Sequence, residues 1–242
     1  MNSTYILSST TRTYITTKYV DELQRESLRK LTELKLQTEI ANDNINHNFE
    51  IISSEEEVKL AIQKAVKLYA IDIIVMGTKG ASNAIGIFMG SNTVDVLNKV
   101  KNYPILVIPD ELEFVEPKQI LFPTDFNRFY ENKELEAIKK ITMLYDSTIK
   151  ILHINVEKKM SVTQEFNKKI LSEYLENYPH SFHWESDYTN KSKTIATFIE
   201  ENQIDILAMV NYKHSLIENI LNEPVIKKIA FQPTVPLLII PE

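Results

Sequence analysis

The sequence predicts an α/β protein made of two tandem copies of one domain, the first truncated at its N-terminus. Each copy is expected to hold an open parallel five-stranded sheet with helices on both faces. Two observations lead to this prediction. Short apolar, β-branched runs alternate with segments of helical period, as in the βαβ units that form parallel sheets. The same motifs also recur at a nearly constant spacing, which indicates a duplicated domain.

The duplication is visible in three separate segments. Each recurs 132 or 133 residues later: Ile71–Met76 as Ile204–Met209, His47–Phe49 as His180–Phe182, and Tyr103–Pro109 as Val235–Pro241. Because separate motifs keep one spacing, the two halves are predicted to share one fold.

The second copy, residues 119–242, is the more complete one. Its apolar runs predict strands near 119–123, 149–155, 182–186, 205–210 and 236–240. Segments of helical period between them predict helices near 132–145, 162–177, 192–202 and 217–230. Strands that are apolar at nearly every position, such as Ile149–Ile154, fit burial on both faces of a sheet.

The first copy, residues 1–109, has one strand fewer. Strands are predicted near 4–8, 48–52, 72–76 and 104–108, and helices near 18–40, 55–70 and 91–101. When Ile6 is aligned with Ile151, the counterpart of the strand that begins at Gln119 falls before residue 1. The first strand and helix of this copy are therefore expected to be absent from this chain. Either the chain starts late, or another segment takes their place in the sheet. Residues 110–118, acidic and proline-bearing, are the predicted linker.

Composition excludes several classes of protein. Lys and Arg number 27 against 33 Asp and Glu, which gives a net charge of −6. This charge gives no reason to expect binding to nucleic acid or to an anionic membrane. Cysteine is absent, which removes disulfides and thiolate chemistry. The N-terminus lacks a signal-peptide pattern and no apolar run has the length of a membrane span. We expect a soluble, cytoplasmic protein.

The most informative local feature is the placement of glycine. All four glycines lie between positions 77 and 90, whereas an average composition would give about 17 in a chain of this length. The pattern is Gly77-Thr78-Lys79-Gly80, nine further residues, then Gly90-Ser91. It joins a predicted strand to a predicted helix, so the backbone there has special requirements.

This pattern predicts an anion site. A glycine after a strand permits a tight turn, and Gly80 allows a ligand to approach the backbone closely. Gly90 and Ser91 begin a helix, whose free N–H groups attract phosphate, and Lys79 adds positive charge. Neither the Walker pattern nor the dinucleotide Gly-x-Gly-x-x-Gly pattern is present. The alternative, that the glycines only shape a turn and Ser91 caps a helix, stays open.

The motif and its flanking strands resemble the universal stress protein family. The resemblance rests on Gly-x2-Gly-x9-Gly-Ser between Ile71–Gly77 and Pro104–Pro109, and on Ile120–Asp125 in the second copy. It covers nearly the whole chain, as a tandem bacterial member, and implies the strand order 3-2-1-4-5. It also implies ATP binding, with phosphate-side residues Gly77, Thr78, Lys79, Gly80, Gly90, Ser91, Asn92 and Thr93.

Each copy departs from the family pattern. The resemblance implies an adenosine-side Asp after the first strand, which the first copy lacks. The second copy keeps Pro123, Thr124 and Asp125 but has Tyr212 and Lys213 where small residues are needed, so its site is expected to be vestigial. The residues alone leave open that Asp125 is simply a turn or cap carboxylate.

The expected function is regulatory binding of a nucleotide, ATP with Mg²⁺, in a stress response, without catalysis and without a metal site of its own. The last strands, 104–108 and 236–240, are apolar throughout and are predicted to pair with each other in an intramolecular pseudo-dimer, which protects both edges. A homodimer and an unidentified protein partner stay open. Two alternatives are a dimerising scaffold that binds no nucleotide and an enzyme of the wider adenine-nucleotide α-hydrolase-like group.

Overall fold

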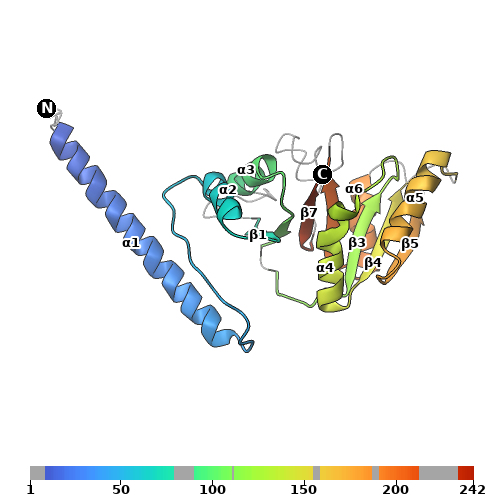
Figure 1. The fold of residues 1–242 in the computed structure, drawn as a ribbon, viewed down its shortest axis with the longest axis horizontal. Coiled ribbons are helices and arrows are strands. Elements are labelled where there is room, and N and C mark those ends of the chain that lie inside the picture. Colours follow the sequence, from blue (N-terminus) through green and yellow to red (C-terminus); the bar gives the residue numbers. More distant parts are fainter. Residues whose placement is uncertain (1–8, 79–89, 111, 155–158, 187–190, 213–233) are drawn as a thin grey trace. The chain divides into compact units, whose positions relative to one another are not determined.

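The computed structural model describes residues 9–78, 90–110, 112–154, 159–186, 191–212 and 234–242 (Figure 1). The chain forms two compact units, Met1–Ala61 and Ile62–Glu242. The division into domains 1–109 and 119–242, joined by residues 110–118, stays a prediction.

The first unit is dominated by one long helix, α1 (Ser9–Ala41), which contains the predicted helix at 18–40. Its solvent face is held by ion pairs one turn apart, such as those of Arg29 with Glu26 at 2.7 Å and with Glu33 at 2.5 Å. Pairs at this spacing stabilise a helix by about 0.2–0.5 kcal/mol each. The prediction of a strand near 48–52 is wrong, since an apolar run becomes a strand only where a neighbour pairs with its backbone, and no described strand does so there.

The described residues of the second unit form one seven-stranded sheet with the order β1-β2-β7-β6-β3-β4-β5. Its strands are β1 (Ile74–Gly77), β2 (Ile105–Ile108), β3 (Gln119–Thr124), β4 (Thr148–Ile154), β5 (His180–Glu185), β6 (Ile206–Asn211) and β7 (Leu237–Pro241). All five strands predicted for the second copy are present. Their order, β5-β4-β3-β6-β7, is the predicted 3-2-1-4-5, and every pair in it is parallel.

The two halves meet at β2 and β7, which pair antiparallel with Ile105 opposite Ile239 and Val107 opposite Leu237. The predicted pairing of the two terminal strands is confirmed. The antiparallel ladder satisfies the backbone groups of both edges and joins the two predicted sheets into one continuous sheet, which has seven described strands. Of the first copy's predicted strands, β1 and β2 are formed, and the one near 4–8 lies outside the described residues.

Helices cover both faces of this sheet, as predicted for an α/β fold (Figure 1). One face packs against α2 (Val58–Leu68), α3 (Ser91–Lys99) and α6 (Lys191–Glu201), whose buried side chains include Val66, Leu97 and Phe198. The other face packs against the 3-10 turn η1 (Asn132–Leu135), α4 (Glu136–Tyr145) and α5 (Val162–Tyr174). The predicted helix at 217–230 lies outside the described residues.

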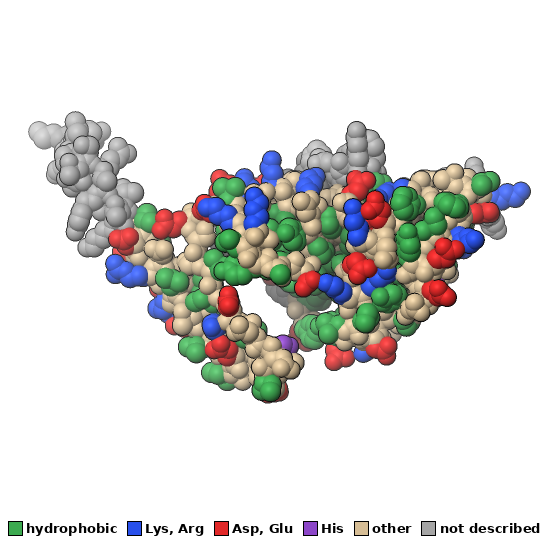
Figure 2. Space-filling model, viewed as in Figure 1, with side chains coloured by type: hydrophobic (Ala, Val, Ile, Leu, Met, Phe, Trp, Pro, Cys, Tyr) green, Lys and Arg blue, Asp and Glu red, His purple; other side chains and the backbone are tan. Residues whose placement is uncertain are grey.

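Successive side chains of β3 enter opposite cores, Leu121 the first and Phe122 the second. This alternation explains why the strand is apolar at consecutive positions. Over the visible face of the sheet-bearing unit, acidic and basic side chains are interspersed and do not gather by sign (Figure 2). Within the described residues, no helix has both the length and the apolar character that crossing a bilayer requires.

Candidate functional site

The two ends of the glycine loop meet beside the carboxyl end of β1. The Gly90 amide donates a hydrogen bond to the Thr78 carbonyl oxygen at 2.6 Å, and the Thr93 hydroxyl donates to the Gly77 carbonyl oxygen at 3.0 Å. Thr78 is 2% exposed, and its own amide donates to Ile108 on β2 at 2.9 Å. These bonds hold the start of α3 next to the carboxyl end of β1 in space. This is the end of the sheet at which α/β proteins bind ligands.

The N-terminus of α3 is capped by backbone alone. Gly90 is the N-cap residue, with φ −65° and ψ 159°, and no side chain among the described residues caps the helix. The Val94 amide is bonded to the Gly90 carbonyl oxygen at 3.1 Å, so the amides of the first turn before it have no intrahelical acceptor. This end of the helix therefore presents N–H groups that no helix carbonyl accepts and the positive end of the helix dipole, the two features that attract an anion.

The structure brings together part of the predicted phosphate-side motif. Gly77, Thr78, Gly90, Asn92 and Thr93 lie at the junction of β1 and α3, where Asn92 is exposed and Thr93 is buried. Because the Thr93 hydroxyl already donates within the protein, Thr93 positions the turn. Ser91 begins α3, while Lys79 and Gly80 lie outside the described residues.

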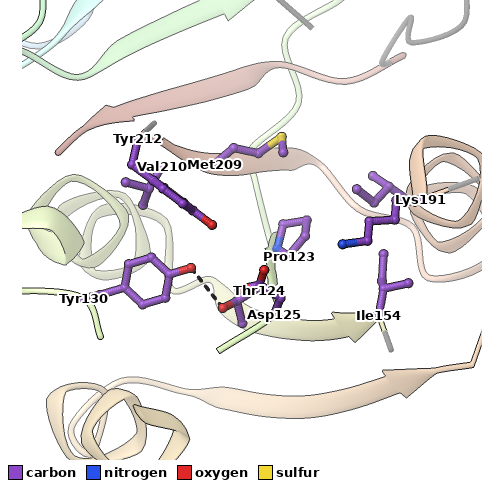
Figure 3. A pocket seen from close by; sticks show the side chains of 10 residues that line it. Pro123, Thr124, Asp125, Tyr130, Ile154, Lys191, Met209, Val210 and Tyr212 are labelled. Carbon is purple, nitrogen blue, oxygen red and sulfur yellow. Dashed lines mark hydrogen bonds between the residues drawn. The ribbon is translucent and has the colours of Figure 1, made fainter. Parts of the chain in front are cut away.

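The second half carries a pocket where its own strand order reverses, at the carboxyl ends of β3 and β6 (Figure 3). The pocket has a volume of about 170 Å³ and is lined by the three predicted residues Pro123, Thr124 and Asp125. Tyr130, Lys191 and Tyr212 complete its polar wall. The Lys191 ammonium and the Tyr212 hydroxyl point into it from different sides (Figure 3). Parallel sheets commonly bind ligands at such a reversal point.

Asp125 serves the turn that follows β3. Its two carboxylate oxygens accept hydrogen bonds from the Asn127 amide at 3.0 Å and from Asn127 Nδ2 at 2.9 Å. Phe126 has a left-handed φ of 56°, and Asn167 of α5 donates to its carbonyl oxygen at 2.7 Å. The turn-carboxylate interpretation of Asp125 therefore describes its contacts in this structure.

Comparison with known proteins finds similarity to one family. Residues 5–109 match the model of the universal stress protein family. This part of the chain, less than half of its 242 residues, is similar to that family. No curated protein sequence matches the chain.

The universal stress protein fold extends over both halves. A universal stress protein structure from Archaeoglobus fulgidus DSM 4304 is similar, with 19% sequence identity, a TM-score of 0.67, and coverage of 93% of this chain and 79% of that one. A second structure named for the same family, from Pseudomonas aeruginosa UCBPP-PA14, has 11% identity, a TM-score of 0.55, and coverage of 88% and 77%. At these identities the likeness shows the fold.

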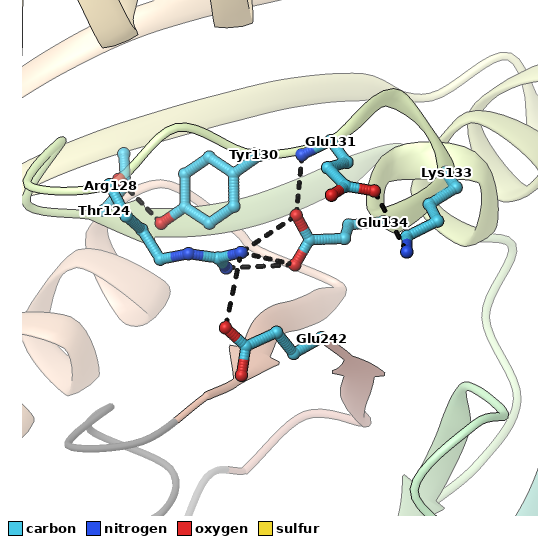
Figure 4. Close-up of polar contacts among 7 residues, drawn as sticks. All are labelled: Thr124, Arg128, Tyr130, Glu131, Lys133, Glu134 and Glu242. Atoms are coloured by element: carbon cyan, nitrogen blue, oxygen red, sulfur yellow. Dashed lines mark hydrogen bonds and ion pairs between the residues drawn. The ribbon is translucent and has the colours of Figure 1, made fainter.

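Within this universal stress protein fold, Arg128 lies beside Tyr130, one of the residues that line the second-half pocket (Figure 4). Its guanidinium lies 5.1 Å from the ring centre of Tyr130 and 4.8 Å from that of Tyr212. Burial raises the pKa of Tyr130, whose hydroxyl lies 2.9 Å from Thr124 Oγ1, and burial also raises the pKa of Tyr212. Both phenols are therefore neutral and can bind a ligand through hydrogen bonds.

Three residues around this pocket were not predicted from the sequence: Arg128, Tyr130 and Lys191. Lys191 is the first residue of α6, next to the predicted helix start at 192, which could have placed it at the carboxyl edge of the sheet. Arg128 and Tyr130 follow the Pro-Thr-Asp segment closely, but no pattern in the sequence indicated that this turn folds back over the pocket.

His153 is a buried imidazole behind the same turn. Its Nδ1–H donates to the Thr124 carbonyl oxygen at 2.9 Å, and its ring lies 4.9 Å from Phe126 and 4.6 Å from Trp184. Its Nε2 has no partner among the described residues. Burial lowers the pKa of His153, against the opposing effects of the Thr124 carbonyl and Asp125. The core-imidazole interpretation agrees with this environment.

We expect His153 to make the protein acid-sensitive. Because its folded-state pKa lies below its unfolded value of about 6.5, the unfolded chain binds more protons there. Stability is therefore retained above that value and falls as the pH drops through it. His153→Asn keeps an N–H donor but removes the titration, so urea unfolding between about pH 7 and pH 5 should show a shallower loss. An unchanged slope, alike in His153→Asn and an exposed-site His47→Asn control, would refute this.

Proposed function

We propose that this universal stress protein binds a nucleotide, ATP with Mg²⁺, through residues 77–93, and that occupancy regulates a stress response in the cytoplasm. The observation that carries the proposal is the hydrogen bond that joins the two ends of the glycine loop. The hydrogen bond from the Gly90 amide to the Thr78 carbonyl oxygen places an open helix N-terminus at the carboxyl end of β1.

The residues present suit the phosphate side of a nucleotide. Gly90 has no Cβ at the N-cap position, so the first-turn amides of α3 stay accessible to phosphate oxygens. The bound triphosphate would bring Mg²⁺ with it, since this ion is commonly held by substrate phosphates and water. The adenosine side is less complete: in the second half, β3 and the Pro-Thr-Asp turn lie beside β6, whereas β1 is the last strand of the described sheet.

The proposal is for binding without efficient turnover. The described residues of the motif, Gly77, Thr78 and Gly90 to Thr93, include no carboxylate or imidazole that could act as a general base. The Thr93 hydroxyl already donates to the Gly77 carbonyl oxygen. ATP is therefore proposed to act as a regulatory ligand and not as a substrate.

A charge placed at the N-cap tests the proposal. Gly90→Asp introduces a favoured cap residue at a backbone conformation that any residue can adopt. Its carboxylate would repel phosphate, so calorimetric titration with Mg-ATP should show affinity lowered at least about tenfold. Gly90→Asn is the matched control for charge: its side chain caps the same amides without a negative charge, so it should weaken binding less than Gly90→Asp does.

Thermal unfolding of the three proteins separates binding from folding. All three should unfold at similar temperatures, since exchange among N-cap residues changes stability by only about a few tenths of a kcal/mol when glycine is replaced. Equal ATP affinity in Gly90→Asp and Gly90→Asn would contradict binding at this helix. Hydrolysis well above that of Gly90→Asp would contradict binding without turnover.

The second candidate function is a scaffold that binds no nucleotide. It is favoured by the continuous sheet, in which β2 and β7 join the halves, and by Tyr212, which lines the second-half pocket with Arg128 stacked on its ring. A folded parent that gives no heat with Mg-ATP would favour this candidate.

A further inference from the structure

The outer edge of β1 is an open strand edge within the described part of the chain. β1 stands at one end of the seven-stranded sheet and pairs with β2 on its inner side. The Ile74 and Thr78 amides donate to the Pro104 and Ile108 carbonyl oxygens, each at 2.9 Å. Because amides alternate in direction along a strand, that of Val75 faces the outer edge. Val75 itself is 59% exposed.

The internal repeat shows what this edge is built to pair with. On the inner side the two halves make the same bond: Ile74 donates to Pro104, and its counterpart Leu207 donates to Pro236, both at 2.9 Å. On the outer side of β6 lies β3, parallel, with Ile120 opposite Ile206 and Leu121 opposite Leu207. The repeat therefore provides a register for a strand beside β1.

An aspartate marks the start of that register in both halves. Asp205 Oδ2 accepts the amides of Lys118 at 2.7 Å and Gln119 at 2.8 Å, so it holds the first residues of β3. The counterpart of Asp205 in the repeat is Asp72. The Asp72 side chain is 73% exposed and pairs with Lys140. An exposed pair of this kind is worth about 0–1 kcal/mol, so an incoming backbone can displace it.

The sheet face beside this edge is apolar and hollow. A groove of about 470 Å³ runs along it, lined by Ile73, Val75, Leu106, Ile108, Phe114 and Leu144 among others. Several of these side chains are exposed, including those of Val75, Phe114 and Leu144. In the second half the corresponding face is covered by α4 and α5. A strand added at β1 would therefore place apolar side chains against apolar surface.

We propose that the outer edge of β1 accepts an extended apolar strand from a partner polypeptide, added parallel to β1 in the register that β3 has beside β6. The partner segment resembles Gln119–Thr124 in chemistry. Its first two amides face Asp72, and its apolar residues point alternately to the α2–α3 core and to the groove. Main-chain hydrogen bonds provide affinity in this mode of recognition, and the side chains provide selectivity.

A peptide with the sequence of residues 117–124, labelled with fluorescein, is the probe for the full-length protein. Fluorescence anisotropy should show saturable binding, and hydrogen exchange at the Val75 amide should slow when the peptide is bound. Val75→Pro removes the outward amide but no bond to β2, a change that edge strands tolerate, and should weaken binding at least about tenfold. Asp72→Ala should weaken it as well, whereas Val75→Thr, which keeps the amide, should not.

Circular dichroism of each variant confirms that the sheet is intact, and the exposed Asp72→Ala change provides a test that does not depend on proline. Absence of peptide binding by the parent, or equal binding by Val75→Pro, Asp72→Ala and the parent, would overturn the proposal. A dimer of the parent that Val75→Pro dissociates, without peptide binding, would overturn it in favour of a second copy.

Discussion

Replacing Phe122 by alanine is expected to lower the free energy of unfolding by about 3–5 kcal/mol. Phe122 lies in β3, is 1% exposed, and packs edge-on against Tyr130 with ring centres 5.2 Å apart. Its removal leaves a cavity in the core that α4 and α5 cover, between strands that cannot collapse into it. Chemical denaturation followed by circular dichroism measures the loss.

Phe122→Leu is the control, because it retains most of the apolar volume and should cost less than about 1.5 kcal/mol. The order of the two variants is the critical result. A loss for Phe122→Ala no greater than that for Phe122→Leu would mean that this position is not packed as the structure has it.

Replacing Arg128 by alanine is expected to cost about 3 kcal/mol, because it leaves a buried carboxylate without its cation. Both terminal guanidinium nitrogens, Nη1 and Nη2, donate to Glu134 Oε1 at 2.9 Å, and Nη2 also donates to Oε2 at 3.1 Å (Figure 4). Glu134 accepts the Glu131 amide as well, and its side chain is 2% exposed. Equilibrium unfolding of the variant gives the cost.

The double variant Arg128→Met/Glu134→Leu separates two causes of the lost stability: the unpaired buried charge of Glu134 and the lost packing of the Arg128 side chain. Removing both charges should recover much of the stability lost in Arg128→Ala, since apolar groups of similar volume often replace a buried ion pair without cost. A double variant less stable than Arg128→Ala would show that the interactions of the ion pair stabilise the folded state by more than the desolvation of its two charges destabilises it.

Much of the second half could be predicted from sequence because its strands and helices have clear local sequence patterns. Strands such as Thr148–Ile154 are apolar on both faces, and helices such as Val162–Tyr174 keep a 3.6-residue period. The pairing of β2 with β7 was also predictable, since two terminal strands that are apolar throughout need cover. The strand predicted near 48–52 failed because apolar composition is not enough without a paired neighbour.

The candidate site was predictable only in part. The glycine pattern located the junction of β1 and α3, because glycine reports a requirement of the local backbone. The use of Thr93 to bond Gly77, and the approach of Lys191 and Tyr212 to Asp125, join residues far apart in the chain. No local pattern encodes such contacts.

The sequence by itself determined the α/β class, the duplicated strands and helices and the glycine loop, since periodicity and backbone requirements are written in neighbouring residues. Only the tertiary structure decided that β1 stands at one edge of the described sheet, and that Asp72, the counterpart of Asp205, pairs with Lys140 and not with a described strand. These features depend on which backbones lie side by side, and hydrogen bonding between strands is set by their three-dimensional order.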